Sequence, residues 1–470
     1  MQQQKTICIQ GLGFVGLAMA TVVANVIDKS GKPRFKVYGV DLPSKQASID
    51  LINKGLLPFK TEDKSFAPEL LKAVCEYKNL VATSDENIYQ QADIVVVDVH
   101  LTISKPDEND YSKYHLYKES FEKAIHSLGK KIKADCLVLV ETTVPPGFTR
   151  NVVCPILKEE FTKRNILSEP LIAHSYERVM PGKEYLNSIR NYYRTFAGLN
   201  EESAALAKQF LETIIHTQAY PLKQEEIPEA SELAKVMENS YRAMNIAFIY
   251  EWTLMAEKMG VNLFSVIEGI RNRNTHKNIM MPGLGVGGYC LTKDSLLALW
   301  SNDNYYHSTF GFPLSTAALK INDAMPLHVV DLIEEYESLE NKKVLILGVS
   351  YREDVGDTRF SPTEVLYKAL QQKKAMVYVH DTYVTNWEEL PDASFVDDFT
   401  GFDILVFATR HQQYVSFSTE DLLRISENTV LVVDANNILS DEKIQLLQKH
   451  QRRVIGIGKG HINKNIKKKE

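Results

Sequence analysis

Short apolar segments rich in Val and Ile recur along most of this chain, and segments long enough to form helices separate them. Gly, Asp or Lys bounds each apolar segment, which is typical of strands buried on both faces of a parallel sheet. Strands that alternate with helices predict βαβ units, so we expect an α/β fold with two Rossmann-like doubly wound domains. The apolar segments are residues 5–10, 35–41, 92–100, 136–141 and 171–175, then 342–348, 375–381, 402–408, 428–435 and 452–458.

The stretch between these two parts differs in its pattern. No Pro or Gly occurs between Pro228 and Gly260, which leaves room for one long helix. Apolar residues recur there every three to four positions, which predicts a mostly buried helix. The helix is expected to begin at Pro228, or slightly later with Ser231 as its N-cap. The apolar residues at this spacing are Leu233, Val236, Met237, Met244, Ala247 and Phe248.

A helix of this length exceeds the need of one small domain, so we expect it to connect domains or to join subunits. We therefore divide the chain into three parts. Residues 1–205 form the first α/β domain, residues 206–325 a helical connector, and residues 326–470 the second α/β domain.

Composition excludes several classes of protein. The 470 residues include 54 Lys and Arg and 60 Asp and Glu, a formal net charge of −6, which argues against non-specific nucleic-acid binding. The sequence has no run of 18 apolar residues, so no membrane span is predicted. The first residues, MQQQKTICIQ, lack the layout of a signal peptide. The five cysteines include no CxxC pair, so neither a disulfide framework nor a metal site is expected. A reduced, cytoplasmic location fits this composition.

A glycine motif joins the first apolar segment to the helix-length segment after it. Gly11 permits a tight turn, Gly13 lets a pyrophosphate approach the backbone, and Gly16 lets the helix pack on the strand. Asp41 ends the next apolar segment, where a carboxylate binds the ribose hydroxyls of NAD and repels the 2′-phosphate of NADP. The sequence therefore predicts NAD binding rather than a turn without a ligand. The motif is Gly11-Leu12-Gly13-Phe14-Val15-Gly16.

Cys290 follows a loop with four glycines between residues 283 and 288 and precedes a helix-length segment. A thiol near the start of a helix is favoured as a thiolate nucleophile. The alternative, a buried inert thiol, stays open for Cys290 and is preferred for Cys8, Cys75, Cys136 and Cys154. Asp294 lies one turn beyond Cys290 on the same face.

Lys235 and Asn239 share a face of the long helix, with Glu232 and Arg242 beside them. A solvated stripe on a surface helix is the alternative interpretation. Residues 142–147 (TTVPPG) and 176–182 (YERVMPG) each follow an apolar segment, at the carboxyl ends of strands where α/β sheets bind ligands.

Taken in order, six motifs resemble those of the UDP-glucose / UDP-N-acetylmannosamine family of nucleotide-sugar 6-dehydrogenases. The resemblance implies an NAD-binding domain, a UDP-binding domain and a long helix between them that also forms a homodimer. It implies a four-electron oxidation of a sugar C6 alcohol to a carboxylate with two NAD⁺, through an aldehyde and a cysteine thioester, for polysaccharide precursor synthesis. The motifs are GLGFVG, TTVPPG, YERVMPG, ELAKVMENSYRAMNIAF, PGLGVGGYCLTKD and GVSYREDVGDTRFSP.

The same resemblance assigns roles to single residues. Cys290 matches the nucleophile, and Lys235 the lysine that stabilises developing oxyanion charge. Asn239 and Asp294 match the pair that positions water and assists proton transfer, and Glu177 matches a carboxylate in thioester hydrolysis. Thr143 matches a catalytic-site residue that binds the cofactor or water, and Arg359 matches an arginine that contacts the cofactor. The implied substrate-binding residues are Glu177, Arg178, Lys235, Asn239, Arg242, Gly287, Tyr351 and Arg352.

This chain also departs from the family pattern. His100-Leu101-Thr102 replaces a short Thr/Pro turn, and Tyr289 stands where His or Ser often precedes the nucleophile. The ERVMPG form resembles the N-acetylated-sugar branch, so UDP-GlcNAc or UDP-ManNAc is expected before UDP-glucose as the substrate.

Two other functions remain open at this stage. One is a two-electron NAD-dependent alcohol or hydroxyacid dehydrogenase in which Cys290 has no covalent role. The other is a non-catalytic protein that senses NAD or a nucleotide.

Overall fold

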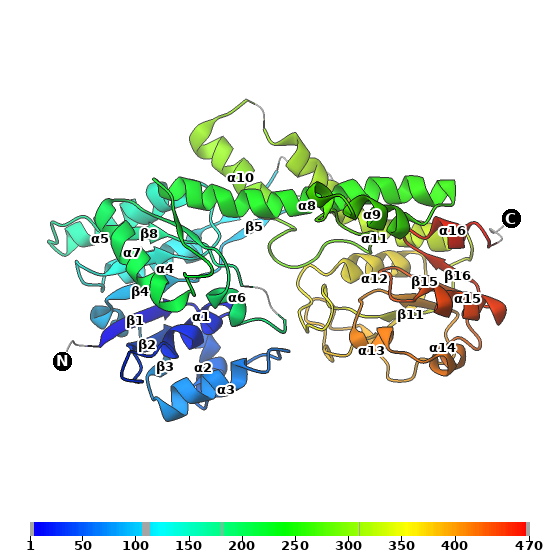
Figure 1. Ribbon diagram of the computed structural model, residues 1–470, viewed down its shortest axis with the longest axis horizontal. Coiled ribbons are helices and arrows are strands. Elements are labelled where there is room, and N and C mark those ends of the chain that lie inside the picture. Colours follow the sequence, from blue (N-terminus) through cyan, green and yellow to red (C-terminus); the bar gives the residue numbers. More distant parts are fainter. Residues whose placement is uncertain (1–3, 106–112, 180–181, 310, 467–470) are drawn as a thin grey trace. The chain divides into compact units, whose positions relative to one another are not determined.

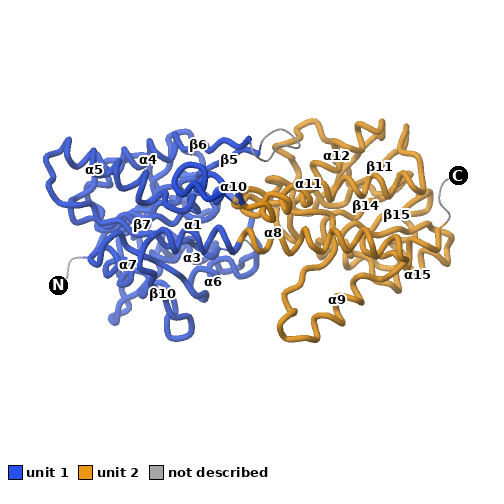
Figure 2. The backbone as a smooth tube through the Cα atoms, turned by 90° about the horizontal axis from the view of Figure 1, so that it is seen from above, with its two compact units in different colours: residues 1–238, 296–311 blue, residues 239–295, 312–470 orange. Residues whose placement is uncertain are grey.

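The computed structural model describes residues 4–105, 113–179, 182–309 and 311–466, and it divides into two compact units. Unit 1 comprises Met1–Glu238 and Leu296–Gly311, and unit 2 comprises Asn239–Ser295 and Phe312–Glu470 (Figure 2). Each unit is built around its own mainly parallel sheet.

The sheet of unit 1 has the strand order β10-β9-β8-β7-β4-β1-β2-β3. Neighbouring strands run parallel, except that β8 and β9 are antiparallel. The chain passes from β1 to β2 on one side and returns to β4 on the other, so the switch point lies between β1 and β4. The strands are β1 (Lys5–Gln10), β2 (Phe35–Val40), β3 (Leu80–Thr83), β4 (Ile94–Val97), β7 (Leu137–Val140), β8 (Leu171–His174), β9 (Thr195–Gly198) and β10 (Lys223–Gln224).

Helices of unit 1 bury their apolar residues against this sheet. Helix α1 is apolar around most of its circumference and buried from Gly16 to Ala24. Its apolar side chains, such as Leu17 and Val23, lie in the same cluster as Ile7 and Ile9 of β1. The helices are α1 (Phe14–Ala24), α2 (Gln46–Ile52), α3 (Phe66–Leu71), α4 (Glu119–Gly129), α5 (Cys154–Lys163), α6 (Asn187–Arg190) and α7 (Glu201–Ile214), with short 3₁₀ or π turns η1 (Pro43–Lys45), η2 (Lys72–Glu76), η3 (Glu86–Gln91), η4 (Thr149–Val153) and η6 (Asn302–Tyr306).

The sheet of unit 2 has the order β13-β12-β11-β14-β15-β16, with all neighbours parallel. Alternate residues of β11 enter two different cores: Val344 and Ile346 on one face, Leu345 and Leu347 on the other. Helices therefore cover both faces of this sheet. The strands are β11 (Lys343–Leu347), β12 (Met376–His380), β13 (Ser394–Phe395), β14 (Ile404–Phe407), β15 (Leu431–Asp434) and β16 (Val454–Gly456).

Helices of unit 2 contribute to both of its hydrophobic cores. Leu366 and Leu370 of α12 lie in one core, and Leu422 of α14 and Ile444 of α15 lie in the other. The helices are α9 (Leu263–Arg271), α11 (Pro313–Glu334), α12 (Pro362–Gln372), α13 (Gln412–Val415), α14 (Thr419–Ile425), α15 (Asp441–Lys449) and α16 (Gly460–Asn463), with the turn η5 (Asn274–His276).

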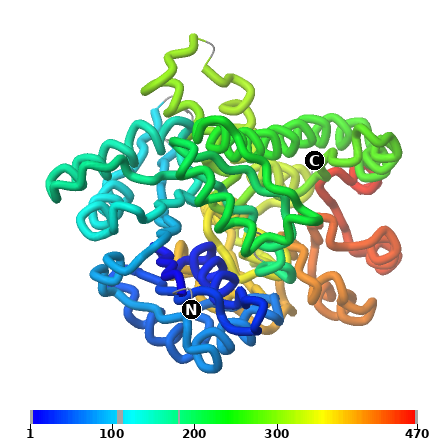
Figure 3. Tube along the Cα trace, turned by 60° about the vertical axis from the view of Figure 1, so that its left-hand side comes forward, coloured from blue at the N-terminus to red at the C-terminus, as the bar shows by residue number. Residues whose placement is uncertain are grey.

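Helix α8 (Pro228–Met259) is unbroken along its length (Figures 1 and 3). It contributes residues to both units (Figure 2). It begins at Pro228, so Ser231 is not an N-cap; Ser231 is buried, with its hydroxyl 2.9 Å from Nδ1 of His174. Helix α10 (Asp294–Ser301) likewise crosses the unit boundary.

The prediction that α8 is mostly buried is wrong on one face. Val236 and Ala247 are buried, but Leu233 and Phe248 are about half exposed, and Met237 is 63% exposed. The spacing of the apolar residues indicates two apolar faces on one helix. Other segments of the protein pack against only one of these faces. We call the other the α8 stripe; it comprises Leu233, Met237, Tyr241, Phe248, Trp252, Met255 and Met259.

Both sheets have the strand order 3-2-1-4-5-6 of dinucleotide-binding folds, with β9 and β10 added at one edge in unit 1. The predicted fold class, two Rossmann-like doubly wound domains and a long helix, is confirmed. Every predicted strand is present, whereas β3, β9, β10, β13 and the antiparallel hairpin β5 (Thr102–Ser104) to β6 (His115–Tyr117) were not predicted. The hairpin begins within the unusual His100-Leu101-Thr102 segment. The three-part division of the chain stays a prediction.

None of the helices in the described part of the chain combines the length and the apolar content needed to cross a membrane.

Candidate functional site

The glycine motif forms a tight turn between β1 and α1. Gly11 has φ +95°, and a Cβ at this position would lie 2.7 Å from the carbonyl oxygen of Asp98. A Cβ on Gly16 would lie 1.9 Å from the carbonyl oxygen of Gly11, so only glycine lets α1 pack this closely on β1. Gly13 precedes the first turn of α1, and no atom lies within 4 Å of where its Cβ would be. The backbone N–H groups of Phe14 and Val15 at this helix start fit a pyrophosphate.

Asp41 follows β2 and holds the glycine turn through its carboxylate. Its Oδ2 accepts a hydrogen bond from the Leu12 N–H at 3.0 Å, and its Oδ1 accepts one from the Leu42 N–H at 2.7 Å. The carboxylate is therefore fixed beside the turn, in the place where a ribose diol is recognised in dinucleotide-binding folds. This arrangement fits NAD.

The loop with Thr143 is fastened to α8 by a buried carboxylate. Glu232 accepts hydrogen bonds from the N–H of Gly147 at 2.5 Å and the N–H of Thr149 at 2.9 Å, and its side chain is 1% exposed. Burial raises the pKa of Glu232 to about 7, although its two backbone hydrogen bonds act in the opposite direction. Thr143 itself is half-buried in this loop.

A cation and a carboxylate of unit 1 meet just beyond β8. The Lys235 ammonium donates to the backbone oxygen of Glu177 at 3.1 Å and lies 3.3 Å from its Oε1. Both residues are only 9% exposed, so Lys235 does not belong to a solvated stripe. Arg178 bonds Glu238 at 2.9 Å and the Tyr176 hydroxyl at 3.1 Å. The remainder of the predicted YERVMPG motif includes Met180 and Pro181, which lie outside the described residues.

In unit 2, Asp294 lies between an amide and a cation. Asn239 donates to its Oδ2 at 2.7 Å, and the Lys293 ammonium bonds its Oδ1 at 3.0 Å. All three side chains are buried, with Asn239 the most exposed at 7%, so the surface-stripe interpretation is wrong for Asn239 as well. Burial opposes the charge on Lys293, but Asp294, Tyr289 and Cys290 outweigh it and raise the pKa of Lys293.

Cys290 lies in the turn that leads into α10. Its carbonyl oxygen accepts the N–H of Asp294 at 2.9 Å, which is the first helical hydrogen bond of α10. Cys290 is half-buried, and it contributes to raising the pKa of both Lys293 and Arg359. The Tyr289 ring lies beneath these two cations, 4.2 Å from the Lys293 nitrogen and 5.9 Å from the Arg359 guanidinium.

The segment with Arg359 closes around the glycine loop of Cys290. The Gly288 N–H donates to the backbone oxygen of Arg359 at 3.1 Å, and Arg359 forms a bidentate ion pair with Asp357. A Cβ on Gly287 would lie 2.4 Å from the Cβ of Tyr351, so this glycine allows the two loops to meet. Gly287, Cys290, Tyr351 and Arg359 are thus brought together within unit 2.

Two predicted substrate-binding residues are not drawn into these clusters. Arg242 on α8 and Arg352 beside Tyr351 are both exposed. Of the other cysteines, Cys8 and Cys136 are buried, and burial raises the pKa of Cys8 to about 12. Cys75 is exposed, so its expected inertness does not follow from burial.

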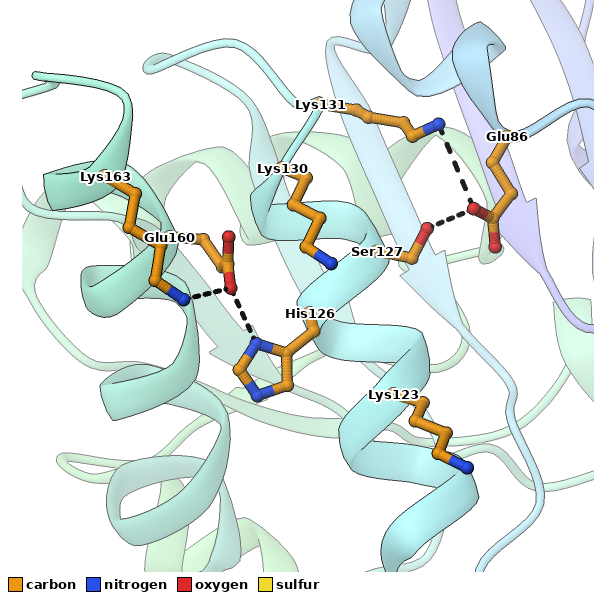
Figure 4. Close-up of a pocket in the computed structure, with 8 residues that line it drawn as sticks. All are labelled: Glu86, Lys123, His126, Ser127, Lys130, Lys131, Glu160 and Lys163. Atoms are coloured by element: carbon orange, nitrogen blue, oxygen red, sulfur yellow. Dashed lines mark hydrogen bonds and ion pairs between the residues drawn. The ribbon is translucent and has the colours of Figure 1, made fainter.

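A surface cavity of about 730 Å³ lies at α4 and α5, away from these residues (Figure 4). Its carboxylates are already paired: Glu160 with Lys163 and His126, and Glu86 with Ser127 and Lys131. None of the predicted site residues lines it, and we assign it no role. Its lining residues are Glu86, Lys123, His126, Ser127, Lys130, Lys131, Glu160 and Lys163.

Sequence reasoning missed Lys293 and the loop-fastening role of Glu232. Lys293 stands directly before Asp294 in the LTKD segment, and this adjacency was the only available signal. Nothing in the sequence shows that Glu232 reaches a loop more than 80 residues away, since that contact depends on how α8 packs.

The sequence matches the three domains of one protein family. Residues 5–217 match the NAD binding domain of the UDP-glucose/GDP-mannose dehydrogenase family, residues 229–324 its central domain, and residues 345–441 its UDP binding domain. The chain is 31% identical over 460 residues to the UDP-N-acetyl-D-mannosamine dehydrogenase of Methanocaldococcus jannaschii, covering 97% of each chain.

Two solved structures are similar along nearly the whole chain. One is an NDP-N-acetyl-D-galactosaminuronic acid dehydrogenase from Methanosarcina mazei, at 26% identity and TM-score 0.79, covering 98% of this chain and 97% of that one. The other is a UDP-D-ManNAc dehydrogenase from Pyrococcus horikoshii, also at 26% identity and TM-score 0.79, covering 97% and 100%. The chain therefore belongs to the UDP-glucose/GDP-mannose dehydrogenase family and is an NAD-dependent UDP-sugar dehydrogenase.

Proposed function

We propose that this enzyme oxidises the C6 alcohol of a UDP-N-acetylhexosamine to the carboxylate, with Cys290 as a covalent nucleophile. The observation that carries the proposal is the setting of Cys290 in the turn that leads into α10, directly after a Tyr289 ring that faces the Lys293 and Arg359 cations. When bound, NAD⁺ would accept one hydride as the alcohol becomes an aldehyde, and a second NAD⁺ would accept another as the thiohemiacetal becomes a thioester. The reaction belongs to polysaccharide precursor synthesis.

Nearby cations favour the thiolate over the thiol, and a thiolate is the reactive form of cysteine. The sulfur adds to the aldehyde carbon and forms a thiohemiacetal, whose oxidation gives a thioester on Cys290. Water then attacks the thioester, releases the carboxylate and restores the thiol. We assign Asp294, which accepts from Asn239 and Lys293, to orienting that water and carrying its proton, and these two contacts support the assignment.

Lys235 and Glu177 divide the remaining work. Lys235 is a buried cation whose ammonium is held in position by Glu177. A cation fixed in position is what stabilisation of a developing oxyanion requires. Glu177 is in turn available as a base for thioester hydrolysis. Thr143 and Arg359 are assigned to cofactor contact, and Arg178, Arg242, Gly287, Tyr351 and Arg352 to the nucleotide sugar.

The preference for an N-acetylated sugar rests on two observations. The ERVMPG segment resembles that branch of the family, and the similar proteins named above act on N-acetylated sugars according to their names. UDP-glucose is the next candidate. Turnover of NAD⁺ with UDP-ManNAc, UDP-GlcNAc, UDP-GalNAc, UDP-glucose and GDP-mannose side by side decides between them; a clear preference for UDP-glucose would contradict the proposal.

The proposal includes a homodimer and a cytoplasmic location. The α8 stripe supports the dimer, because an apolar stripe along a helix is typical of a surface that another chain covers. The cytoplasm supplies NAD⁺ and keeps a catalytic thiol reduced.

Cys290→Ser tests the covalent step. A serine hydroxyl is a much weaker nucleophile at neutral pH, so we expect the variant to bind NAD⁺ and sugar but to lose complete oxidation. The measurements are NADH released per sugar and the mass of the protein after a single turnover. Cys75→Ser is the matched control, since it makes the same exchange at an exposed cysteine outside the proposed site. Two NADH per sugar from Cys290→Ser would rule out the covalent route, and one NADH from the wild type would indicate a two-electron dehydrogenase.

A further inference from the structure

Three charged groups at the carboxyl edge of the unit 1 sheet have no part in the mechanism above. Asp98 directly follows β4, Glu141 directly follows β7, and Arg194 directly precedes β9. The Asp98 N–H bonds the Gln10 oxygen at 2.9 Å, and the Glu141 N–H bonds the Val97 oxygen at 3.0 Å, so both carboxyls are placed by the strand ladder itself.

Asp98 borders the cofactor turn. It directly follows β4 on one side of the switch point, and Gly11 directly follows the register partner of β4, strand β1, on the other. The Cβ of Asp98 lies 3.3 Å from where a Cβ on Gly16 would be, and its carbonyl oxygen lies 2.7 Å from where a Cβ on Gly11 would be. A displacement of Asp98 would therefore move the turn that receives the pyrophosphate.

If all three side chains are ionised, two of their carboxylate oxygens have no hydrogen-bond donor in the described part of the chain. Arg194 donates to Glu141 Oε1 at 2.5 Å, and the two side chains are 1% and 0% exposed. In contrast, Asp98 Oδ2 and Glu141 Oε2 are buried and accept from no donor among the described residues. The residues before them, Val97 and Val140, are register partners on the neighbouring strands β4 and β7, so Asp98 and Glu141 lie side by side on the same face of the sheet edge.

The charges around the two carboxyls are unequal. Asp98, Glu141 and Glu177 could carry three negative charges, whereas Arg194 is the buried cation that faces them. Burial and the neighbouring Glu141 and Glu177 carboxylates hold the pKa of Asp98 well above its usual range, and the positive charge of Arg194 opposes them. Lys235 is engaged with Glu177.

We propose that Asp98 and Glu141 share one proton, so that Asp98, Glu141 and Arg194 form an electrically neutral support for the cofactor turn. In this arrangement protonated Asp98 donates from Oδ2 to Glu141 Oε2, and Glu141 accepts from Arg194 through Oε1. Each oxygen left without a donor then has a partner. Asp98 is a positioning residue, since it acts on the cofactor through the backbone of Gly11 and the packing of Gly16.

Infrared spectroscopy of the full-length protein detects the proton directly. We expect the carbonyl stretch of a protonated carboxyl at pH 8, where ordinary Asp and Glu are ionised. The band should shift when aspartate carries ¹³C at its side-chain carboxyl, and it should vanish in Asp98→Asn. Spectra are taken in a Glu232→Gln background, because the pKa of Glu232 is about 7 and its residual acid form would contribute. Absence of the band from the unsubstituted pair would overturn the proposal, as would its persistence in Asp98→Asn.

Two replacements of similar size test the positioning role. Asp98→Asn keeps a donor toward Glu141 Oε2, so the Kd for NAD⁺ measured by calorimetry should stay within about threefold. Asp98→Leu leaves that oxygen unsatisfied, so the Kd should rise on the order of tenfold, with a lower Tm. Equal effects of Asn and Leu would contradict a role for the shared proton. Because NAD⁺ binding and the infrared band do not depend on Cys290, failure here is distinguishable from failure of the covalent mechanism.

Discussion

Lys235 shows at the scale of a residue how burial changes an interpretation. A lysine and an asparagine one turn apart on a helix normally form a solvated stripe, but here Lys235 is 9% exposed and its ammonium faces Glu177. Lys235→Ala should lower kcat on the order of 10²–10³-fold, with a much smaller change in KM, because a fixed cation acts chiefly as oxyanion charge develops.

The matched control is Lys258→Ala on the same helix, whose ammonium is exposed and pairs with Glu335. We expect it to leave kcat unchanged. If Lys235→Ala retained kcat within a few-fold, Lys235 would not be part of the catalytic machinery.

Glu232 leads to a prediction about pH and stability. Its pKa in the folded protein is about 7, against an ordinary value of 4.5, because burial disfavours the charged form. The folded protein therefore retains a proton at Glu232 where the unfolded chain has lost it, so this residue lowers the free energy of unfolding as the pH rises from about 4.5 to about 7. Relative to Glu232→Gln, which does not titrate, the wild-type Tm should fall across this window and level off above it. A constant Tm difference from pH 4.5 to 8 would contradict the raised pKa.

At the scale of an element, the β1–α1–β2 unit combines features that lie close together in sequence. Strand, glycine turn, helix and acidic residue were predictable because each depends on local backbone conformation and short-range packing. The structure adds that Asp41 is fixed by the Leu12 and Leu42 N–H groups.

The contribution of Lys293, just before the start of α10, was not predictable, because its effect on Cys290 and Asp294 arises from burial.

Asp41→Ala tests cofactor choice at this unit. The wild type should strongly prefer NAD⁺, and the variant should lose on the order of tenfold to a hundredfold of that preference, because the carboxylate no longer accepts from the ribose or repels a 2′-phosphate. The measurement is kcat/KM with NAD⁺ and with NADP⁺. Asp50→Ala, an exposed carboxylate on α2, is the control. Equal use of both cofactors by the unsubstituted enzyme would contradict the role of Asp41.

At the scale of the whole molecule, the α8 stripe links the fold to assembly. An unpaired apolar stripe on the longest helix predicts a second copy of the chain as its cover. Trp252→Glu combined with Met237→Glu should convert the proposed dimer to a monomer, because both substitutions place charges in the stripe. Sedimentation velocity measures the change.

Leu167→Glu is the control for the dimer experiment, since Leu167 is 99% exposed and lies outside α8. It should remain dimeric. A wild-type protein that sediments as a monomer at micromolar concentration would show that the stripe has another purpose.

The sequence alone determined the alternation of strands and helices, the glycine turn with Asp41, and the motifs that carry the family resemblance. These features depend on residues within one turn or one βαβ unit. Only the tertiary structure decided which face of α8 is covered, and that Lys235 meets Glu177, 58 residues away, and Asn239 meets Asp294, 55 residues away. The pairing of Asp98 with Glu141 likewise required two separate strands to lie side by side. Periodicity specifies that a face is apolar or a residue is charged, but the packing of distant segments decides what covers that face and which groups lose their water.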